Sequence, residues 1–244
     1  MNEAIYQARR DLCDSLHLPS TRAGFCMLRG RQRLKLLVWE AGLGGVYAVK
    51  RGMDILIAAT ALVVLAPFLL LMALLICAED GWPVFFVQKR VGLNGREFWF
   101  FKFRSMYRDA ELRKAALSAQ NDSRDGVIFK MRNDPRVTRV GRILRRFSID
   151  ELPQILNVVR GDLAIVGPRP PVPREVALYT LAERKRLHVK PGLTCLWQIQ
   201  GRSEIPFKQQ VRLDLQYIQS QSIWKDIVII LKTVPAVLLG RGAY

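Results

Sequence analysis

Two adjacent carboxylates, Asp150 and Glu151, are the residues of this sequence best suited to do chemistry. They stand in a stretch, residues 130–169, that holds nine Lys or Arg against four acids, a net charge of +5. Carboxylates surrounded by guanidinium groups suit a reaction that handles phosphates and a divalent cation. The arginines and a helix N-terminus are expected to lower the pKa of both carboxyls, so that they stay ionised at neutral pH. An ionised Asp can act as a nucleophile or as a metal ligand.

The spacing of these residues also has a purely structural explanation. Ser148-Ile-Asp-Glu151 matches a capping box, in which the Glu side chain bonds back to the amide of the Ser that begins a helix. A capping box would account for Glu151 without any ligand. It does not account for Asp150 beside it, nor for the density of arginines, so both explanations stay open for Glu151.

Two helices are expected to position the carboxylates. Asp134-Pro135 is typical of a helix start, with Asp as the N-cap and Pro at the first helical position. The arginines of this first helix either face solvent or form a patch at a membrane surface, but Arg145 lies within a turn or two of Asp150. The second helix is predicted over residues 148–159.

Beyond the second helix the sequence predicts a strand, a turn and another strand. Residues 163–166 are apolar throughout, which predicts a buried strand. Gly167-Pro-Arg-Pro170 follows, and its two prolines restrict the backbone that presents Arg169. Lys190-Pro-Gly192 begins a further strand, predicted over residues 193–199.

The strongest apolar signal runs from Ile55 to Ala78, 24 residues without a formal charge. About 20 such residues suffice for a transmembrane helix, so a simple span is one interpretation. Pro67 argues against it, because it interrupts the helix near its middle and leaves halves of about 18 Å. Basic residues, which prefer the cytoplasmic side, precede the segment (Arg29, Arg31, Arg33, Lys35, Lys50, Arg51) and follow it (Lys89, Arg90, Arg96, Lys102, Arg104). We therefore predict a re-entrant membrane helix over residues 53–79 with Pro67 as its hinge.

A hairpin is predicted after the apolar segment, and an amphipathic helix is predicted near the end of the sequence. Residues 84–87 and 97–103 flank Asn94-Gly95, a typical two-residue hairpin turn. Aromatic side chains on both faces of the second strand place one face against the core and the other at lipid headgroups, unless the strand is buried on both faces. Residues 223–239 are largely apolar but charged, which favours an amphipathic helix at the membrane interface. The intervening sequence predicts a polar helix over 108–120, a loop over 121–126 and a strand over 127–131.

Composition limits the class of protein. The chain has 244 residues, half of them apolar, and fits one domain, residues 49–244, preceded by a basic and partly disordered N-terminal tail, residues 1–48. The net charge of +17 indicates an anionic partner, which can be nucleic acid, an anionic lipid surface or a phosphorylated small molecule. The four cysteines lack metal-ligand spacing and indicate free thiols in a reducing compartment. Both histidines lie far from Asp150 in sequence, which argues against histidine-based hydrolysis.

Five motifs carry a resemblance to a known family. They are Lys50-Arg51 before the Pro-broken apolar segment, Phe101-Lys-Phe-Arg-Ser-Met106, Ser148-Ile-Asp-Glu-Leu-Pro-Gln154, Val166-Gly-Pro-Arg-Pro170 and Lys190-Pro-Gly-Leu-Thr194. In this order they resemble the bacterial sugar transferase family, the monotopic phosphoglycosyl transferases, over roughly residues 48–244. Cys195 departs from the pattern, because members often have Gly there, and it is a candidate influence on nucleotide or sugar choice.

The resemblance implies a fold and a mechanism. The fold would be α+β, a small mixed helical and β catalytic domain with a Pro-broken re-entrant membrane helix and interfacial amphipathic helices. Asp150 would attack the β-phosphate of a UDP-sugar, expel UMP and hold the phosphosugar until polyprenyl (undecaprenyl) phosphate displaces it. Glu151, with Asp150, would bind Mg²⁺, and Arg145 and Arg169 would bind phosphate oxygens.

Lys102 and Arg104 are weaker candidates for phosphate binding and are expected to contact lipid headgroups instead. The partners implied by the resemblance are a UDP-sugar, polyprenyl phosphate and lipid of the bacterial cytoplasmic (inner) membrane. The active site would lie on the cytoplasmic face of this membrane. The protein can also form a homodimer under this interpretation, and nucleic acid is not expected as a partner. The sugar would be a hexose such as glucose or galactose, and the reaction the first membrane step of exopolysaccharide, capsule or O-antigen synthesis.

Two other classes of protein compete with this interpretation. A non-catalytic, basic, membrane-associated protein that binds anionic lipid or nucleic acid would explain the charge of +17, but not the adjacent acids beside Arg169. An aspartyl-phosphate phosphatase would also use Asp and Mg²⁺, but the sequence contains no DxDx[TV] motif. Release of UMP from a UDP-sugar distinguishes the transferase from both.

Overall fold

The computed structural model describes residues 22–110, 112–113, 134–201 and 205–238, with side chains described for residues 45–237 within these ranges. The chain forms two compact units, Met1–Arg51 and Gly52–Tyr244; packing and the site, described below, belong to the second. In chain order the elements are α2 (Arg22–Asp80), β1 (Phe85–Val91), η1 (Leu93–Gly95), β2 (Glu97–Phe103), α4 (Arg139–Arg146), η3 (Ile149–Gln154), α5 (Ile155–Arg160), β3 (Ala164–Val166), α6 (Pro173–Ala177), α7 (Leu181–Arg184), η4 (Lys185–His188), β4 (Gly192–Thr194), α8 (Leu196–Gln200), α9 (Phe207–Gln219) and α10 (Ile223–Leu238). The predicted mixture of helix and strand is confirmed, and helix dominates.

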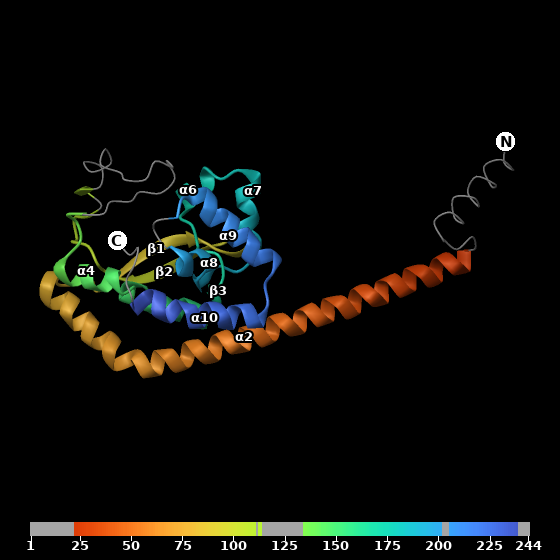
Figure 1. Cartoon of the computed structure of the whole chain (residues 1–244), viewed down its shortest axis with the longest axis horizontal. Helices are drawn as coiled ribbons and strands as arrows, with labels where there is room; N and C mark the ends of the chain where they lie inside the picture. Colours follow the sequence, from red (N-terminus) through yellow and green to blue (C-terminus); the bar gives the residue numbers. More distant parts are fainter. Residues whose placement is uncertain (1–21, 111, 114–133, 202–204, 239–244) are drawn as a thin grey trace. The chain divides into compact units, whose positions relative to one another are not determined.

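The long helix α2 continues through Pro67 without a break. Its portion Gly45–Asp80 is long and apolar enough to cross a membrane, and only 6% of the most apolar window is buried. Figure 1 shows the helix bending in its C-terminal part, which carries Pro67; a proline bends a helix because it removes one backbone hydrogen bond. The helix extends past both ends of the predicted segment 53–79, and its re-entrant course stays a prediction.

Several sequence predictions concern residues that the structure describes only in part. The N-terminal tail, predicted over residues 1–48, is helical from Arg22 onward, and its first 21 residues lie outside the described ranges. The polar helix predicted over 108–120 is mostly outside them. The loop and strand predicted over 121–131 are wholly outside them.

Charged side chains form hydrogen bonds between the C-terminal end of α2 and the elements that follow. Arg104 is buried, and its Nη2 donates to the carbonyls of Asp80 at 3.0 Å and Gly81 at 2.6 Å, in the last turn, where helix carbonyls lack intrahelical partners. Glu79 accepts from the amide of Arg139 at 2.7 Å, at the start of α4. The prediction that Arg104 contacts lipid headgroups is therefore wrong, because its guanidinium binds inside the protein.

Strands β1 and β2 form the predicted antiparallel hairpin, with Phe85 opposite Phe103 and Val91 opposite Glu97. The prediction of a two-residue turn was wrong, because residues 92–96 join the strands and include the short 3₁₀ helix η1. Asn94 (φ 53°) and Gly95 (φ 82°) both have left-handed backbone, a conformation that Asn and Gly tolerate. The Asn-Gly pair thus marked the place of the turn but not its length.

Strands β3 and β4 form a second, parallel pair. β3 is buried throughout, as predicted. The strand predicted over residues 193–199 was too long, since β4 ends at Thr194 and the chain then turns into α8. A Cβ atom on Gly192 would lie 2.0 Å from the backbone N of Gly167, so this crossing of two backbones requires glycine.

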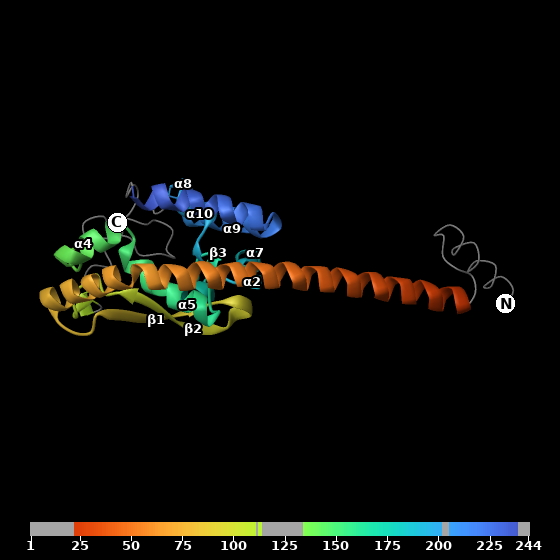
Figure 2. The same ribbon diagram turned by 90° about the horizontal axis from the view of Figure 1, so that it is seen from below.

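The main core lies where α2, α5, β3 and α10 meet. Val158, Leu163 and Ile229 are almost completely buried there, and burial of each side chain contributes about 1.5–3 kcal/mol. The helix predicted over residues 223–239 is confirmed as α10, in which Ile229 is buried while Trp224 and Leu231 are exposed; its amphipathic character stays a prediction. Figure 2 shows α10 and the β1–β2 hairpin on either side of the C-terminal part of α2. A position of α10 at a membrane interface stays a prediction.

The two helices predicted around the acidic pair exist but begin at other residues. α4 is capped by Thr138, whose Oγ1 accepts from the amide of Gly141 at 2.8 Å. Asp134, the predicted cap, instead binds the guanidinium of Arg136 at 2.6 Å. The second helix starts as the 3₁₀ helix η3 before it continues as α5, and Ser148 precedes it with left-handed backbone (φ 53°) and without a side-chain cap.

Candidate functional site

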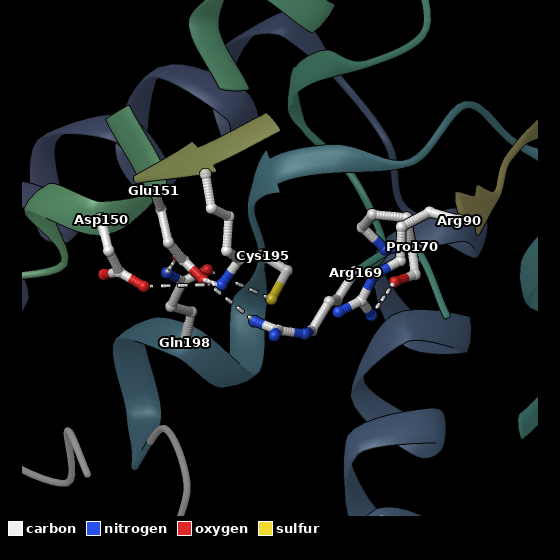
Figure 3. A network of polar contacts seen from close by, with 8 residues as sticks. Arg90, Asp150, Glu151, Arg169, Pro170, Cys195 and Gln198 are labelled. Carbon is white, nitrogen blue, oxygen red and sulfur yellow. Dashed lines mark hydrogen bonds and ion pairs between the residues drawn. The ribbon is translucent and has the colours of Figure 1, made fainter. Parts of the chain in front are cut away.

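The 3₁₀ helix η3 presents both carboxylates from its first turn. β2 packs directly against η3, and the turn after β3 and the helix α8 complete the surroundings of the pair. Figure 3 shows the side chains of Glu151, Arg169 and Gln198 pointing toward one another, with Asp150 beside them. Segments distant in sequence therefore meet at the acidic pair.

Glu151 contacts polar side chains from three other elements. Its Oε1 accepts from Lys102 Nζ at 2.8 Å and from Arg169 Nη1 at 3.4 Å. Its Oε2 lies 3.5 Å from Gln198 Nε2, whose own Oε1 faces the thiol of Cys195 at 3.8 Å. The capping-box explanation of Glu151 is therefore wrong, since its carboxylate faces these groups and Ser148 makes no cap.

Asp150 is buried, with 8% of its surface exposed. Its nearest cation is Lys102, whose Nζ lies 3.7 Å from Oδ2. Burial raises the pKa of the Asp150 carboxyl above its ordinary value and Glu151 adds to the rise, while Lys102 and Arg145 oppose it. The prediction of a lowered pKa was wrong for Asp150 because the fold removes this carboxylate from water, which disfavours its charged form.

Lys102 belongs to the site, although the sequence placed it at lipid headgroups. Its side chain is 17% exposed, and its ammonium lies 5.7 Å from the centre of the Phe100 ring as well as beside both acids. Alternation along a strand puts Lys102 and Phe100 on one face of β2. A single lysine in the aromatic run 98–103 was the signal available in the sequence, but it did not reveal which face meets η3.

Arg145 and Arg169, the predicted phosphate-binding residues, line one cavity with the acidic pair. Arg169 is contributed by the turn after β3; its side chain is 38% exposed and its guanidinium lies 6.0 Å from the Trp197 ring centre. Arg145 lies in the last turn of α4, close enough to lower the pKa of Asp150. The structure thus brings together four residues that the sequence singled out. It joins to them Lys102, which the sequence named as a weaker candidate for phosphate binding, and Gln198, which it did not name.

The cavity has a volume of about 910 Å³ and a strongly cationic lining. Nine Lys or Arg line it against three acids: Arg90, Lys102, Arg104, Arg108, Arg136, Arg145, Arg169, Arg174 and Arg186, with Asp150, Glu151 and Glu175. Burial, and then the nearby charge of Arg169, lower the pKa of Arg90 to about 10. Such an excess of guanidinium groups suits a ligand that carries several negative charges, such as a diphosphate.

A buried ion pair supports the turn that carries Arg169. Arg186 binds the carboxylate of Asp214, lies 3.2 Å from the hydroxyl of Tyr179, and donates to the carbonyl of Arg169 at 3.4 Å. Arg186 and Asp214 are both almost fully buried. Burial raises the pKa of Asp214 to about 6, although Arg186 opposes the rise. This network holds the backbone of the turn while the Arg169 side chain stays at the cavity.

The acidic pair fits one kind of metal site. The described ranges contain no group of three or more Asp, Glu, His or Cys that could hold a metal ion. Mg²⁺ is commonly held by one or two carboxylates, with substrate phosphates and waters as its other ligands. Asp150 and Glu151 would supply those two carboxylates if the protein binds Mg²⁺, and the cationic cavity beside them suits phosphates; the metal stays a prediction.

Known proteins are similar to this chain over most of its length. A family model described as bacterial sugar transferase matches residues 46–240. The galactosyl transferase CpsE of Streptococcus agalactiae is 52% identical over 166 residues, which make up 68% of this chain and 37% of CpsE. The exopolysaccharide production protein ExoY of Rhizobium meliloti is 43% identical over 205 residues, 83% of this chain and 90% of ExoY. The UDP-glucose:undecaprenyl-phosphate glucose-1-phosphate transferase of Caulobacter vibrioides is 41% identical over 203 residues, 80% of this chain and 72% of that protein.

Proposed function

Because the chain belongs to the bacterial sugar transferase family, we propose that it is a phosphoglycosyl transferase that moves a sugar 1-phosphate from a UDP-sugar to polyprenyl (undecaprenyl) phosphate. A relative carries this reaction in its name, with glucose as the sugar, and the name of CpsE specifies galactosyl transfer. We therefore expect a hexose such as glucose or galactose. The observation that carries the proposal is the buried Asp150 beside Glu151, at the wall of a cavity lined by nine cationic residues.

The proposed reaction has two displacements at phosphorus. In the first, an Asp150 oxygen attacks the β-phosphorus of the UDP-sugar, the bond from that phosphorus to the bridging oxygen breaks, and UMP leaves with the bonding electrons. In the second, a phosphate oxygen of the polyprenyl phosphate attacks the same phosphorus, and the bond to Asp150 breaks. The aspartate is regenerated and the product is a polyprenyl diphosphosugar. Dividing one transfer into two steps is the usual advantage of a covalent intermediate.

The side chains around Asp150 fit distinct parts of this reaction. Lys102, 3.7 Å from Asp150 and 2.8 Å from Glu151, favours the ionised form of the nucleophile. The guanidinium of Arg169 presents a planar pair of donors that matches phosphate oxygens, and Arg145 brings a second such group to the same cavity. Mg²⁺, held by Glu151 and Asp150, would neutralise charge on the diphosphate.

The proposal includes attachment to the bacterial cytoplasmic membrane through α2. The helix is apolar enough to enter a membrane, and a re-entrant course about Pro67 would keep both basic flanks and the site on the cytoplasmic side. Single cysteines introduced near residues 35 and 96 should then both react with a membrane-impermeant thiol reagent from the cytoplasmic side. Labelling from opposite sides would show a simple span instead.

The decisive experiment supplies the sugar donor without the acceptor. Purified protein with Mg²⁺ and a UDP-hexose should release no more than one UMP per active site and retain the phosphosugar on Asp150, detectable by mass spectrometry. Added polyprenyl phosphate should discharge the label and start steady turnover with ping-pong kinetics. Failure to label the protein, together with double-reciprocal plots that intersect, would favour direct transfer in a ternary complex.

A further inference from the structure

One wall of the cavity differs from the rest in chemistry. Pro83, Phe85, Phe86 and Val87 line the cavity, and each is exposed; we call these four residues the apolar rim. Their three largest side chains, Phe85, Phe86 and Val87, are 44%, 41% and 43% exposed. Exposed apolar side chains gathered beside a strongly cationic site indicate a ligand with an apolar part.

The apolar rim lies at the start of strand β1, and further polar residues line the cavity near the end of this strand. Phe85 begins the strand and Val91 ends it. At the far end, the amide of Val91 donates to the carbonyl of Pro171 at 2.9 Å, and Arg90 donates to the carbonyl of Pro170 at 3.0 Å. Polar and charged side chains of α6, of the connection after α6, of η4 and of α9 line the cavity beyond this point: Arg174, Glu175, Tyr179, Arg186 and Gln210. The cavity therefore extends along β1, with the apolar rim at the end of the strand next to α2, where Arg104 and Arg108 also line the cavity.

The apolar rim is continuous with the end of the membrane-type helix. α2 ends at Asp80, three residues before Pro83, and Trp82 between them is 69% exposed. Arg104 holds this connection by bonds from its Nη2 to the carbonyls of Asp80 and Gly81. A ligand whose tail lies in the bilayer beside α2 would thus meet the apolar rim first on its way to the cavity.

Phe86 is the residue of the apolar rim placed nearest to the reacting groups. It lies directly opposite Lys102 in the β1–β2 ladder, so the two side chains share a face with Cβ atoms about 4.5–5.5 Å apart. Lys102 Nζ in turn lies 3.7 Å from Asp150. An amphiphile with an anionic head could place that head at Lys102 and its first apolar atoms on the Phe86 ring.

We propose that the apolar rim binds the first isoprene units of the polyprenyl phosphate acceptor, with Phe86 as the main contact. The inference rests on the proposed function for the identity of the acceptor. A UDP-sugar has no apolar chain and gains nothing from the apolar rim, so its nucleotide belongs at the other end of the cavity, near α6 and η4. The two substrates then approach Asp150 from opposite ends of β1, and only the second displacement depends on Phe86.

The test measures the two displacements separately in Phe86→Ala. Labelling by the UDP-sugar alone should proceed at the rate of the unchanged protein. The KM for undecaprenyl phosphate should rise about tenfold, equivalent to about 1.4 kcal/mol. The KM for geranyl phosphate, which keeps the first two isoprene units, should rise by a similar factor. Phe86→Leu, which keeps an apolar side chain, should restore most of the affinity for the long-chain acceptor.

Trp99→Ala provides the matched control. Trp99 is also exposed, at 55%. It lies on the face of the hairpin opposite Phe86, paired with Lys89, and it is not among the described residues that line the cavity. An unchanged KM for undecaprenyl phosphate in Phe86→Ala, or an equal rise in Trp99→Ala, would overturn the proposal. Slowed labelling by the donor in Phe86→Ala would overturn it as well. The proposed function fails by a different result, the absence of UMP release and labelling in the unchanged protein.

Discussion

Two buried aspartates of this protein, Asp150 and Asp214, differ in how closely their carboxylates are paired with a cationic side chain. Asp214 is 1% exposed and binds the guanidinium of Arg186, which is itself buried. Asp150 is 8% exposed, and its nearest cation, Lys102, lies closer to Glu151 (2.8 Å) than to Asp150 (3.7 Å). Burial raises the pKa of both carboxyls. The difference lies in how completely the surrounding protein compensates the charge.

This difference separates a structural carboxylate from a reactive one. Asp214 has a dedicated partner inside the protein, and the pair supports the backbone of the Arg169 turn. Asp150 shares its cation with a second carboxylate and lies at the wall of a cavity. A carboxylate that is buried but incompletely paired is available to a ligand, and strongly perturbed groups in cavities are frequent at functional sites.

The largest predicted effect comes from replacing the carboxylate at the cavity. Asp150→Asn should lower turnover at least about a thousandfold, because an amide cannot form the acyl phosphate. The protein should stay folded, as circular dichroism and thermal unfolding can check, and should not be labelled by a UDP-sugar. A folded Asp150→Asn protein that releases UMP at the original rate would remove Asp150 as the nucleophile.

The matched substitution at the other aspartate should affect stability instead. Asp214→Asn leaves the guanidinium of Arg186 buried without its counter-charge, which should lower the free energy of unfolding by about 3–5 kcal/mol. Denaturant unfolding measures this loss. Donor labelling per folded molecule should change much less than in Asp150→Asn. Equal loss of labelling in both variants, without loss of stability in Asp214→Asn, would contradict the distinction between the two sites.

Lys102→Gln tests whether the neighbouring cation sets the pKa of the Asp150 carboxyl. Activity needs ionised Asp150, so it should fall as the pH decreases through the raised pKa of this carboxyl. Lys102 opposes that rise; its removal should therefore move the acidic limb of the pH–rate profile to higher pH and lower the rate at neutral pH about 10- to 100-fold.

The control for this variant is Lys89→Gln. Lys89 belongs to the same hairpin but pairs with Glu97 at 3.1 Å on the exposed face. Its replacement should leave the pH profile of donor labelling unchanged. An acidic limb that stays in place in Lys102→Gln would show that this lysine does not set the ionisation of Asp150.

The smallest effect is expected from an exchange that keeps the charge. Arg169→Lys retains a cation at the cavity but loses the planar fork that matches two phosphate oxygens. The KM for the UDP-sugar should rise about tenfold with little change in stability, because the Arg169 side chain is 38% exposed. Steady-state kinetics and thermal unfolding measure the two quantities. A large loss of stability would place Arg169 with the structural pair Arg186–Asp214 instead.

Local patterns in the sequence were sufficient to find part of the fold. The buried strand β3, the hairpin and the helix α10 were predicted because apolar runs, turn residues and helical periodicity are recorded in neighbouring residues. Element boundaries were less well predicted. Thr138 caps α4 in place of Asp134 because Asp134 binds Arg136 instead, and β4 stops at Thr194 because α8 begins directly afterwards.

The sequence by itself determined which groups could react: the adjacent acids Asp150 and Glu151, the turn that carries Arg169, and an apolar helix interrupted by Pro67. Each of these features consists of residues close together in the chain, so the residue types and their order are sufficient to identify it. Only the tertiary structure decided that Lys102 joins the acids, because it depends on which face of β2 packs against η3. The direction of the pKa shift of Asp150 was decided in the same way, since burial is a property of the packed protein and no local pattern records it.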